Sequence, residues 1–270
     1  MDEERNRNVI NTLRSMEVHR SWESAYRTSE NNIFYGICFD YISSVYGSLD
    51  DEAVLDAGCG SGAKTQLLAE RGYRVVAVDI SRKVLDEARQ NIERNGYRGR
   101  ATFQLENITD MSFSDSSFSR VLSWGVLMHV PNVEKAISEL ARVTRRGGTI
   151  VISEANVSSL QAKTFRSLKT LLQRKRTEMH RTAAGIEFWE ETPSGQLVTR
   201  QTDMGWIIRA FETCGVGLIR RRAGQFSEIY TLLPWRMMRR IVHTFNNYWF
   251  RHITYPGLAF GNLLVFRKYI

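Results

Sequence analysis

The sequence predicts an α/β protein whose core is a doubly wound, mostly parallel sheet. Between residues 53 and 155, short apolar runs typical of strands alternate with amphipathic stretches typical of helices, and this order implies parallel crossover connections. Runs such as RVVAVDI at 74–80 are apolar on both faces, which suits strands covered by helices on two sides. A glycine-rich turn, GCGSG at 58–62, directly follows the first run.

The strands and helices of this core have recognisable limits. Strands are expected at 53–58, 74–80, 101–107, 119–126 and 149–154, and two more at 216–222 and 261–269 complete a seven-stranded sheet. Ser81 is expected to cap the helix over 81–97, because serine favours that position. Two further helices, over 63–73 and 132–148, are expected to stop at glycine, at Gly72 and at Gly147-Gly148.

The pattern outside the core predicts a cap and a lid. We expect a helical N-terminal cap, the α/β core, an inserted lid and a C-terminal completion of the sheet, at 1–50, 51–155, 156–202 and 203–270. The lid contains a basic, helix-like stretch at 163–176 and a mixed segment around Trp189. The C-terminal part adds helices near 203–214 and 233–250.

The glycine-rich turn predicts a binding site for a nucleotide-like cofactor. Glycines directly after a strand let the backbone turn sharply and approach a ligand, and the helix that follows presents free amides to it. The pattern also fits the loose dinucleotide motif G-x-G-x-x-G/A. Asp56, two residues before Gly58, favours a different cofactor, because a carboxylate there would repel a diphosphate. It suits S-adenosylmethionine, which carries an ammonium and a sulfonium group and no phosphate.

Polar side chains at the ends of the next two strands complete the predicted cofactor site. Asp79 ends the second strand, where a carboxylate can accept hydrogen bonds from both ribose hydroxyls. Asn107 ends the third strand, where its carbonyl oxygen can accept a hydrogen bond from the exocyclic amine of adenine.

With these motifs the chain resembles the class I S-adenosylmethionine-dependent methyltransferases. DAGCGSG at 56–62 matches the family's D-x-G-x-G-x-G, and ENITDMSFSDSSFSRVLSWGVLMHV and RVTRRGGTIVISE resemble later motifs in the same order. The resemblance runs from about 53 to 155 and implies a Rossmann-like fold. It departs at Asn107, Ser119 and Arg146, where the family has Asp, Asp and Pro.

The resemblance also implies the cofactor contacts. The glycine loop would approach the methionine part of the cofactor, Asp79 would bind the ribose, and Asn107 and Ile108 would meet the adenine. Ser123 and Trp124 would line the cleft for methyl transfer. The expected cofactor-binding residues are therefore Asp56, Gly58, Cys59, Gly60, Gly62, Asp79, Ile80, Asn107, Ile108, Ser123 and Trp124.

Methyl transfer from a sulfonium needs alignment and exclusion of water, and a base only where the acceptor is protonated. His129, just past the fourth strand, is the candidate base, with a backbone hydrogen bond as its alternative role. Trp22 and Tyr26 share one helix face and can close over the methionine end of the cofactor or pack against the core. Four groups in the cap and lid could reach a substrate and have no ranking among them, namely His19, His180, Glu190 and Glu191.

The expected acceptor is an oxygen or nitrogen atom of a small molecule, such as a natural product, a sugar or a sugar-nucleotide. SWGV at 123–126 lacks the Pro-Pro-aromatic loop of amino-methylases, and no cysteine follows a proline as cytosine C5 methylation requires. No carboxylate cluster predicts a metal ion. An RNA substrate, a nicotinamide-dependent oxidoreductase and a non-catalytic scaffold are less favoured interpretations, and no nucleic acid partner is expected.

The net charge of +8 is concentrated near the C-terminus, where residues 205–270 hold 10 Lys/Arg and 2 Asp/Glu. Within 232–250, apolar residues recur at helical spacing between arginines. Such a basic amphipathic helix can make peripheral contact with an anionic membrane or frame an acidic or bulky substrate, although packing on the domain is the commoner arrangement. The alternative acceptor is therefore a lipid-linked or isoprenoid molecule at a membrane surface.

Two features of the sequence predict the cellular compartment, namely its polar N-terminal residues and its few, widely spaced cysteines. The polar opening MDEERNRNVI does not resemble a signal peptide. Three distant cysteines, Cys38, Cys59 and Cys214, suit reduced thiols. We therefore expect a cytoplasmic protein, with no prediction of its oligomeric state.

Overall fold

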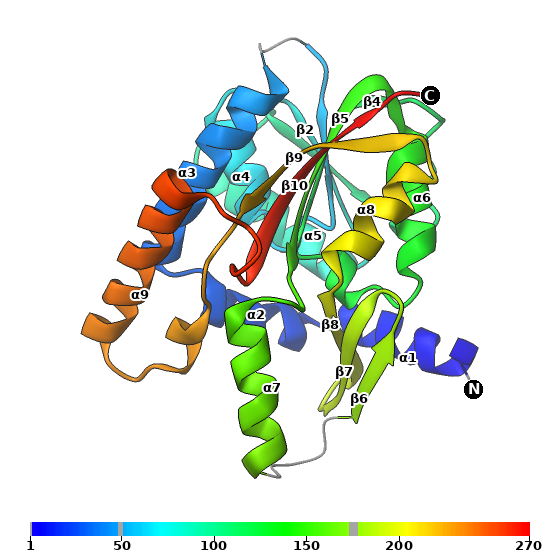
Figure 1. Cartoon of the computed structure of the whole chain (residues 1–270). Helices are drawn as coiled ribbons and strands as arrows, with labels where there is room; N and C mark the ends of the chain where they lie inside the picture. Colours follow the sequence, from blue (N-terminus) through cyan, green and yellow to red (C-terminus); the bar gives the residue numbers. More distant parts are fainter. Residues whose placement is uncertain (1, 48–50, 173–177) are drawn as a thin grey trace.

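A computed structural model describes residues 2–47, 51–172 and 178–270 of the chain. Its centre is a seven-stranded sheet in the order β3-β2-β1-β4-β5-β10-β9 (Figure 1). The strands are β1 Val54–Ala57, β2 Val75–Asp79, β3 Ala101–Leu105, β4 Phe118–Trp124, β5 Thr144–Ala155, β9 Val216–Ala223 and β10 Gly261–Lys268. Only β10 runs antiparallel to its neighbours, β5 and β9, among the described strands of this sheet. The predicted doubly wound, mostly parallel sheet of seven strands is confirmed.

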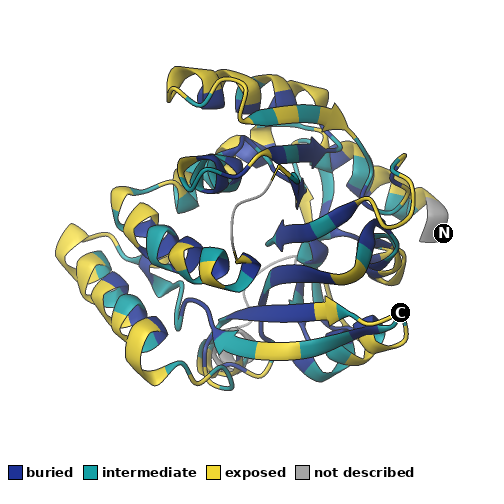
Figure 2. Ribbon diagram, turned by 90° about the horizontal axis from the view of Figure 1, so that it is seen from above, coloured by how far each residue is buried: buried dark blue, intermediate teal, exposed yellow. Residues whose placement is uncertain are grey.

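Helices cover both faces of the sheet, as the apolar strands require. On one face α3 Ser29–Tyr46, α4 Ala63–Glu70 and α5 Arg82–Arg94 bury residues such as Phe39, Leu68 and Leu85. On the other face α6 Val133–Val143 and α8 Met204–Glu212 bury Ile137, Leu140 and Phe211. Figure 2 shows the buried strands between these two helical layers, whose outer sides are exposed. All four residues of β1 are buried, so this central strand is fixed from both sides.

The parallel arrangement brings the carboxyl ends of five strands to one edge of the sheet. β1 ends at Ala57, β2 at Asp79 and β4 at Trp124. β3 and β5 end at the same edge, because each pairs in parallel with a neighbouring member of this group. Ligands bind at this edge in open α/β sheets, so the topology itself places the candidate site.

One local prediction within the core is wrong. The predicted helix over 132–148 ends at Val143, and the segment from Thr144 continues directly as β5, where Thr144 pairs with Phe118. The glycine pair therefore lies inside a strand with a register shift rather than after a helix. Ser81 is the N-cap residue of α5, as predicted, although its hydroxyl donates to the Arg14 carbonyl instead of making a capping bond.

The N-terminal cap is three helices that reach the site edge. α1 Asp2–Leu13 lies along the insertion, where the Thr12 hydroxyl donates to the Ser194 carbonyl. α2 Met16–Tyr26 crosses the carboxyl edge of the sheet, and α3 returns the chain to the sheet face. Thr28 caps α3 through its side chain, which accepts from the Asn31 amide.

The insertion after β5 contains a second sheet that the sequence did not reveal. After α7 Leu160–Leu172, three antiparallel strands follow in the order β6-β7-β8, at Glu178–Thr182, Gly185–Thr192 and Gly195–Thr202. The predicted helix-like stretch at 163–176 coincides with α7 as far as residue 172, and its last residues lie outside the described part of the chain.

The C-terminal segment adds a helical hairpin beside α3. It consists of the short helix η2 Ile229–Leu232, α9 Arg236–Tyr248 and a π-helical turn η3 Trp249–Ile253. Figure 1 shows α9 in orange alongside α3. No helix in the described ranges is both long and apolar enough to cross a bilayer.

Candidate functional site

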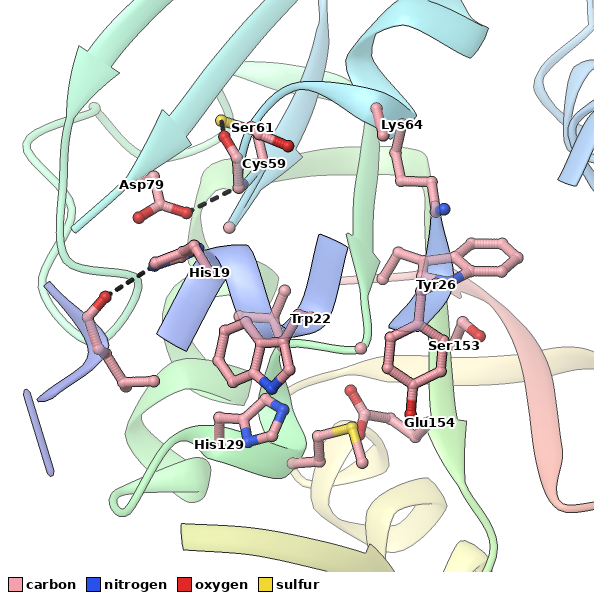
Figure 3. Close-up of a pocket in the computed structure, with 18 of the residues that line it drawn as sticks. His19, Trp22, Tyr26, Cys59, Ser61, Lys64, Asp79, His129, Ser153 and Glu154 are labelled. Carbon is pink, nitrogen blue, oxygen red and sulfur yellow. Dashed lines mark hydrogen bonds between the residues drawn. The ribbon is translucent and has the colours of Figure 1, made fainter. Parts of the chain in front are cut away.

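A cavity of about 820 Å³ lies at the carboxyl edge of the sheet. Its walls come from α1, α2, the glycine loop, the ends of β2, β4 and β5, the short helix η1 Leu127–His129, and the start of η2. Figure 3 shows labelled side chains of α2, the glycine loop, β2, β5 and η1 around it. The predicted site residues on its walls are Trp22, Tyr26, Gly58, Cys59, Gly60, Asp79, Ile80, Asn107, Ile108, Trp124 and His129.

The glycine loop needs glycine for three separate reasons. Gly58, Gly60 and Gly62 all have positive φ, at 82°, 53° and 85°. A Cβ on Gly58 would lie 2.6 Å from both γ-methyl carbons of Val126, and one on Gly62 would lie 3.1 Å from the Ala88 Cβ. A Cβ on Gly60 would meet nothing within 4 Å. Gly58 and Gly62 therefore allow tight packing, whereas Gly60 leaves open space on the cavity wall for a ligand.

Asp79 is tied to this loop and still has acceptor capacity. Its Oδ2 accepts the Gly60 amide at 3.0 Å and its Oδ1 accepts the Ser81 amide at 3.0 Å. Burial raises the pKa of this carboxyl, while His19 opposes that rise electrostatically. A carboxylate has about four acceptor sites on its two oxygens, so Asp79, which lines the cavity, keeps acceptor capacity for ribose hydroxyls. The ribose contact itself stays a prediction.

The prediction that Asp56 faces the cofactor is wrong. Asp56 is buried beneath the loop and does not line the cavity. Its Oδ2 accepts the Thr65 hydroxyl at 2.6 Å, and burial raises its pKa to about 6. The side chain therefore holds the first turn of α4 against β1. Gly62 and Ser123 also lie off the cavity wall, because Gly62 packs on α5 and Ser123 is fully buried within β4.

Asn107 lines the cavity but uses its carbonyl oxygen locally. Asn107 Oδ1 accepts the Thr109 amide at 3.1 Å and the Thr109 hydroxyl at 2.9 Å. Both acceptor sites of this oxygen are therefore occupied. The predicted hydrogen bond from an adenine amine to this oxygen is not available in this conformation. The neighbouring Ile108 contributes an apolar wall suited to a flat ring.

His129 is oriented as a neutral imidazole. Its Nδ1 lies 2.9 Å from the Val198 carbonyl oxygen, which can only accept, so Nδ1 carries the proton. Nε2 then holds a free lone pair. Burial lowers the pKa of His129 to about 4, so the ring is uncharged at neutral pH. The Trp22 indole stacks on this imidazole at 4.5 Å (Figure 3).

Sequence reasoning missed Glu154 as a site residue. Glu154 ends the apolar run of β5, is buried and lines the cavity. Its Oε1 accepts the Leu127 amide at 3.0 Å, whereas its Oε2 is buried without a hydrogen-bond partner. Burial raises the pKa of Glu154 to about 8. An acid at the end of a buried apolar run, as at Asp79, was the available signal.

A second group of missed residues lies at the Tyr26 end of the cavity. The Tyr26 hydroxyl donates to Glu228 Oε2 at 3.0 Å, and burial raises the pKa of Glu228 to about 7. Lys64 Nζ lies 3.1 Å from the centroid of the Tyr35 ring, and burial lowers the pKa of Lys64 to about 7. Figure 3 shows Lys64 and Tyr26 on the opposite side of the cavity from Asp79.

The insertion holds the helix that carries His129. Arg200 of β8 is buried and donates to the carbonyl oxygens of Leu127 and Val130 at 2.9 and 3.2 Å. Its charge is balanced by Glu187 of β7, whose Oε1 lies 2.7 Å from Nη2. Both ends of η1 are therefore fixed from the second sheet.

Of the remaining candidates in the cap and lid, only one lines the cavity. His19 lines the cavity, and its Nε2 lies 2.8 Å from the Leu13 carbonyl oxygen. His180, Glu190 and Glu191 are on the second sheet and do not line the cavity. Within the described ranges, no three His, Cys, Asp or Glu side chains gather as metal ligands.

The sequence model of the family described as "Methyltransferase domain" matches residues 55–152. These residues are the ones that form the glycine loop, Asp79 and η1. The chain carries a class I S-adenosylmethionine-dependent methyltransferase domain.

Curated methyltransferases are similar to part of this chain. Methyltransferase GfsG of Streptomyces halstedii is 33% identical over 114 residues, which cover 41% of this chain and 41% of that protein. The malonyl-[acyl-carrier protein] O-methyltransferase of Serratia marcescens is 36% identical over 110 residues, with the same 41% coverage of each. The match thus spans about two fifths of these curated relatives.

A solved structure extends the likeness in fold to the whole chain. Magnesium protoporphyrin IX methyltransferase (ChlM) from Synechocystis PCC 6803, with bound SAH, superposes with a TM-score of 0.65. The comparison covers 97% of this chain and 99% of that one at 17% identity. Glu154, α2 and the insertion lie outside the residues matched to the methyltransferase domain.

Proposed function

We propose that this protein transfers the methyl group of S-adenosylmethionine to an oxygen or nitrogen atom of a small molecule. The observation that carries the proposal is that one cavity contains both the expected cofactor site and candidate bases. The glycine loop and Asp79 line it together with two groups that can take a proton, His129 and Glu154. The expected cofactor site and a candidate base thus lie in the same cavity.

The residues present fit the cofactor that the family implies. The open space at Gly60 admits a ligand close to the backbone, and the Asp79 carboxylate offers acceptors for two hydroxyls. Ile80 and Ile108 give an apolar setting for an aromatic base. When bound, S-adenosylmethionine supplies an activated methyl group on a sulfonium.

The residues of this chain position the acceptor, exclude water and hold the proton. α2 covers the cavity through Trp22 and Tyr26, which limits access of water. The acceptor's proton would pass to His129 Nε2 or to Glu154 Oε2, each of which has a free lone pair when unprotonated. In its protonated form, Lys64, whose Nζ lies 3.1 Å from the centroid of the Tyr35 ring, would pair with a ligand carboxylate at this end of the cavity.

The size of the cavity supports a small-molecule acceptor. About 820 Å³ is within the range of sites that hold a cofactor and a small ligand. A natural product, a sugar or a sugar-nucleotide fits this interpretation. The alternative is a lipid-linked or isoprenoid acceptor, favoured by exposed apolar residues on α9. An RNA acceptor would require binding that weakens steeply with salt.

Calorimetry of an Asp79→Ala variant tests the proposal. We expect S-adenosylmethionine to bind the wild-type protein and to lose most of its affinity for the variant, because two hydroxyl contacts disappear. Asp86→Ala is the matched control, since Asp86 is an exposed aspartate on α5 paired with Arg89. Unchanged affinity of a folded Asp79→Ala protein would remove the ribose role.

A further inference from the structure

Helix α9 presents its apolar face to solvent and its polar face to the protein. Trp235, which precedes it, is 68% exposed, and Met237 and Ile241 are 74% and 63% exposed. His243 and Asn246 are instead 4% and 0% exposed. This reverses the commoner arrangement of amphipathic helices, in which the apolar stripe packs on the domain.

Specific hydrogen bonds fix the helix in this rotation. Asn246 Oδ1 accepts the Ser227 amide at 3.1 Å, and its Nδ2 donates to the Ser227 carbonyl at 2.9 Å. His243 packs its ring on Tyr230, with centroids 4.2 Å apart. Turning the apolar stripe inward would break both contacts. The exposed stripe is therefore a built feature of the fold.

The exposed stripe is continuous and has a basic border. We define the α9 surface as six exposed apolar residues of this hairpin together with three neighbouring arginines, namely Leu232, Trp235, Met237, Ile241, Phe245, Tyr248, Arg236, Arg240 and Arg251. The apolar members on the helix recur at spacings of three and four and so share one face. Arg236 and Arg240 flank this face one residue earlier in each turn.

Charge decides what kind of partner this surface fits. Residues 229–270 contain six Lys/Arg and no Asp or Glu. On the border, the exposed Arg240 faces Glu30 of α3, whose Oε1 lies 3.8 Å from Arg240 Nε. An apolar face with tryptophan and tyrosine, bordered by arginines, matches the interface of an anionic bilayer.

We propose that the α9 surface docks on an anionic lipid bilayer, with its apolar residues between the headgroups. The docking would bring the site close to the membrane. Glu228, which lines the cavity, directly precedes η2, and Leu232 and Trp235 follow it within seven residues. The inference goes beyond methyl transfer and does not depend on it.

Cosedimentation with vesicles tests the docking. We expect the wild-type protein to pellet with vesicles of phosphatidylcholine and phosphatidylglycerol, and much less with phosphatidylcholine alone. The double variant Met237→Glu/Ile241→Glu should bind the mixed vesicles at least about tenfold more weakly, because two charges would enter the apolar layer. Arg236→Gln/Arg251→Gln should reduce the preference for phosphatidylglycerol.

Met179→Glu is the matched control. Met179 is an exposed methionine on β6, in the second sheet and far from α9 (Figure 1), so this variant should bind vesicles like the wild type. Binding that is absent, or unaffected by Met237→Glu/Ile241→Glu, would overturn the proposal. So would a dimer in light scattering that this variant dissociates, because the surface would then cover a second copy. Cofactor calorimetry on the same variants keeps this outcome separate from the methyltransferase proposal.

Discussion

Trp22 of α2 stacks on His129 of η1, with ring centroids 4.5 Å apart and planes inclined by 26°. The same helix contacts the glycine loop, where the Ser61 hydroxyl donates to Glu23, and the start of η2, where Tyr26 donates to Glu228. α2 is therefore held on three sides of the cavity. The stack joins the helix that covers the cavity to the candidate base, so closure and base position are linked.

Trp22→Ala should loosen α2. Aromatic pairs contribute about 0.5–1.5 kcal/mol beyond their buried area, which corresponds to roughly 2–12-fold in an opening equilibrium. We expect amide hydrogen exchange over Met16–Tyr26 to accelerate by that factor, with a smaller change in Trp22→Phe. If exchange over α2 is the same in all three proteins, the stack does not hold the helix.

The protonation state of His129 can be observed directly. Because burial lowers its pKa to about 4 and Val198 accepts from Nδ1, ¹⁵N-histidine NMR at pH 7 should show a neutral ring protonated at Nδ1. If His129 is the base, the acid limb of the methyl-transfer rate should lie near pH 4. If Glu154 is the base, the limb should lie near pH 8. An Nε2-protonated ring would exclude His129 as the base.

Glu154→Gln should change how stability depends on pH. The folded-state pKa of Glu154 is raised to about 8, above the ordinary 4.5, so the folded protein binds more protons between these values. Stability from this group is therefore present at low pH and is lost as pH rises toward 8. Glu154→Gln keeps an acceptor for the Leu127 amide and cannot ionise.

The measurement is thermal unfolding of both proteins at pH 5 and pH 8.5. Relative to the wild type, Glu154→Gln should gain at least about 1 kcal/mol between these pH values, about 2–4 °C in Tm for a chain of this size. A Tm difference that is independent of pH would contradict this account, because it would show that the folded-state pKa of Glu154 is not raised above its unfolded value.

Two alanine substitutions in the glycine loop should differ in their effect on folding. Gly58→Ala adds left-handed strain and a clash with the Val126 methyl groups, so it should cost several kcal/mol. Gly60→Ala adds strain without a clash, about 1 kcal/mol, but places a methyl group in the open space on the cavity wall. Urea unfolding and cofactor calorimetry should therefore show Gly58→Ala as mainly a stability defect and Gly60→Ala as mainly a binding defect. Equal stability losses would contradict this division.

The alternation of strand-like and helix-like segments was sufficient to predict the sheet. Strands buried on both faces, such as RVVAVDI, are apolar throughout and are therefore easy to recognise in the sequence. The alternation was also sufficient for Asp79, since an acid directly after such a strand lies at the carboxyl edge. The direction of a side chain within a strand was harder to predict. Asp56 lies in an equally prominent motif, yet it points to Thr65 beneath the loop.

Features set by tertiary contacts could not be predicted from local pattern. The second sheet is stabilised by Arg200, whose partners Leu127 and Val130 are about seventy positions away in the sequence. The outward rotation of α9 depends on Asn246 bonding to Ser227, which the apolar spacing does not report. In both places, polar side chains that look ordinary in the sequence decide the structure.

Calorimetric titration of the wild-type protein with S-adenosylhomocysteine and, separately, with NAD⁺ tests the central claim most directly. The cavity beside Asp79 and the glycine loop predicts saturable binding of S-adenosylhomocysteine at one site and no heat with the dinucleotide. Saturable binding of NAD⁺ with no heat from S-adenosylhomocysteine would contradict the account.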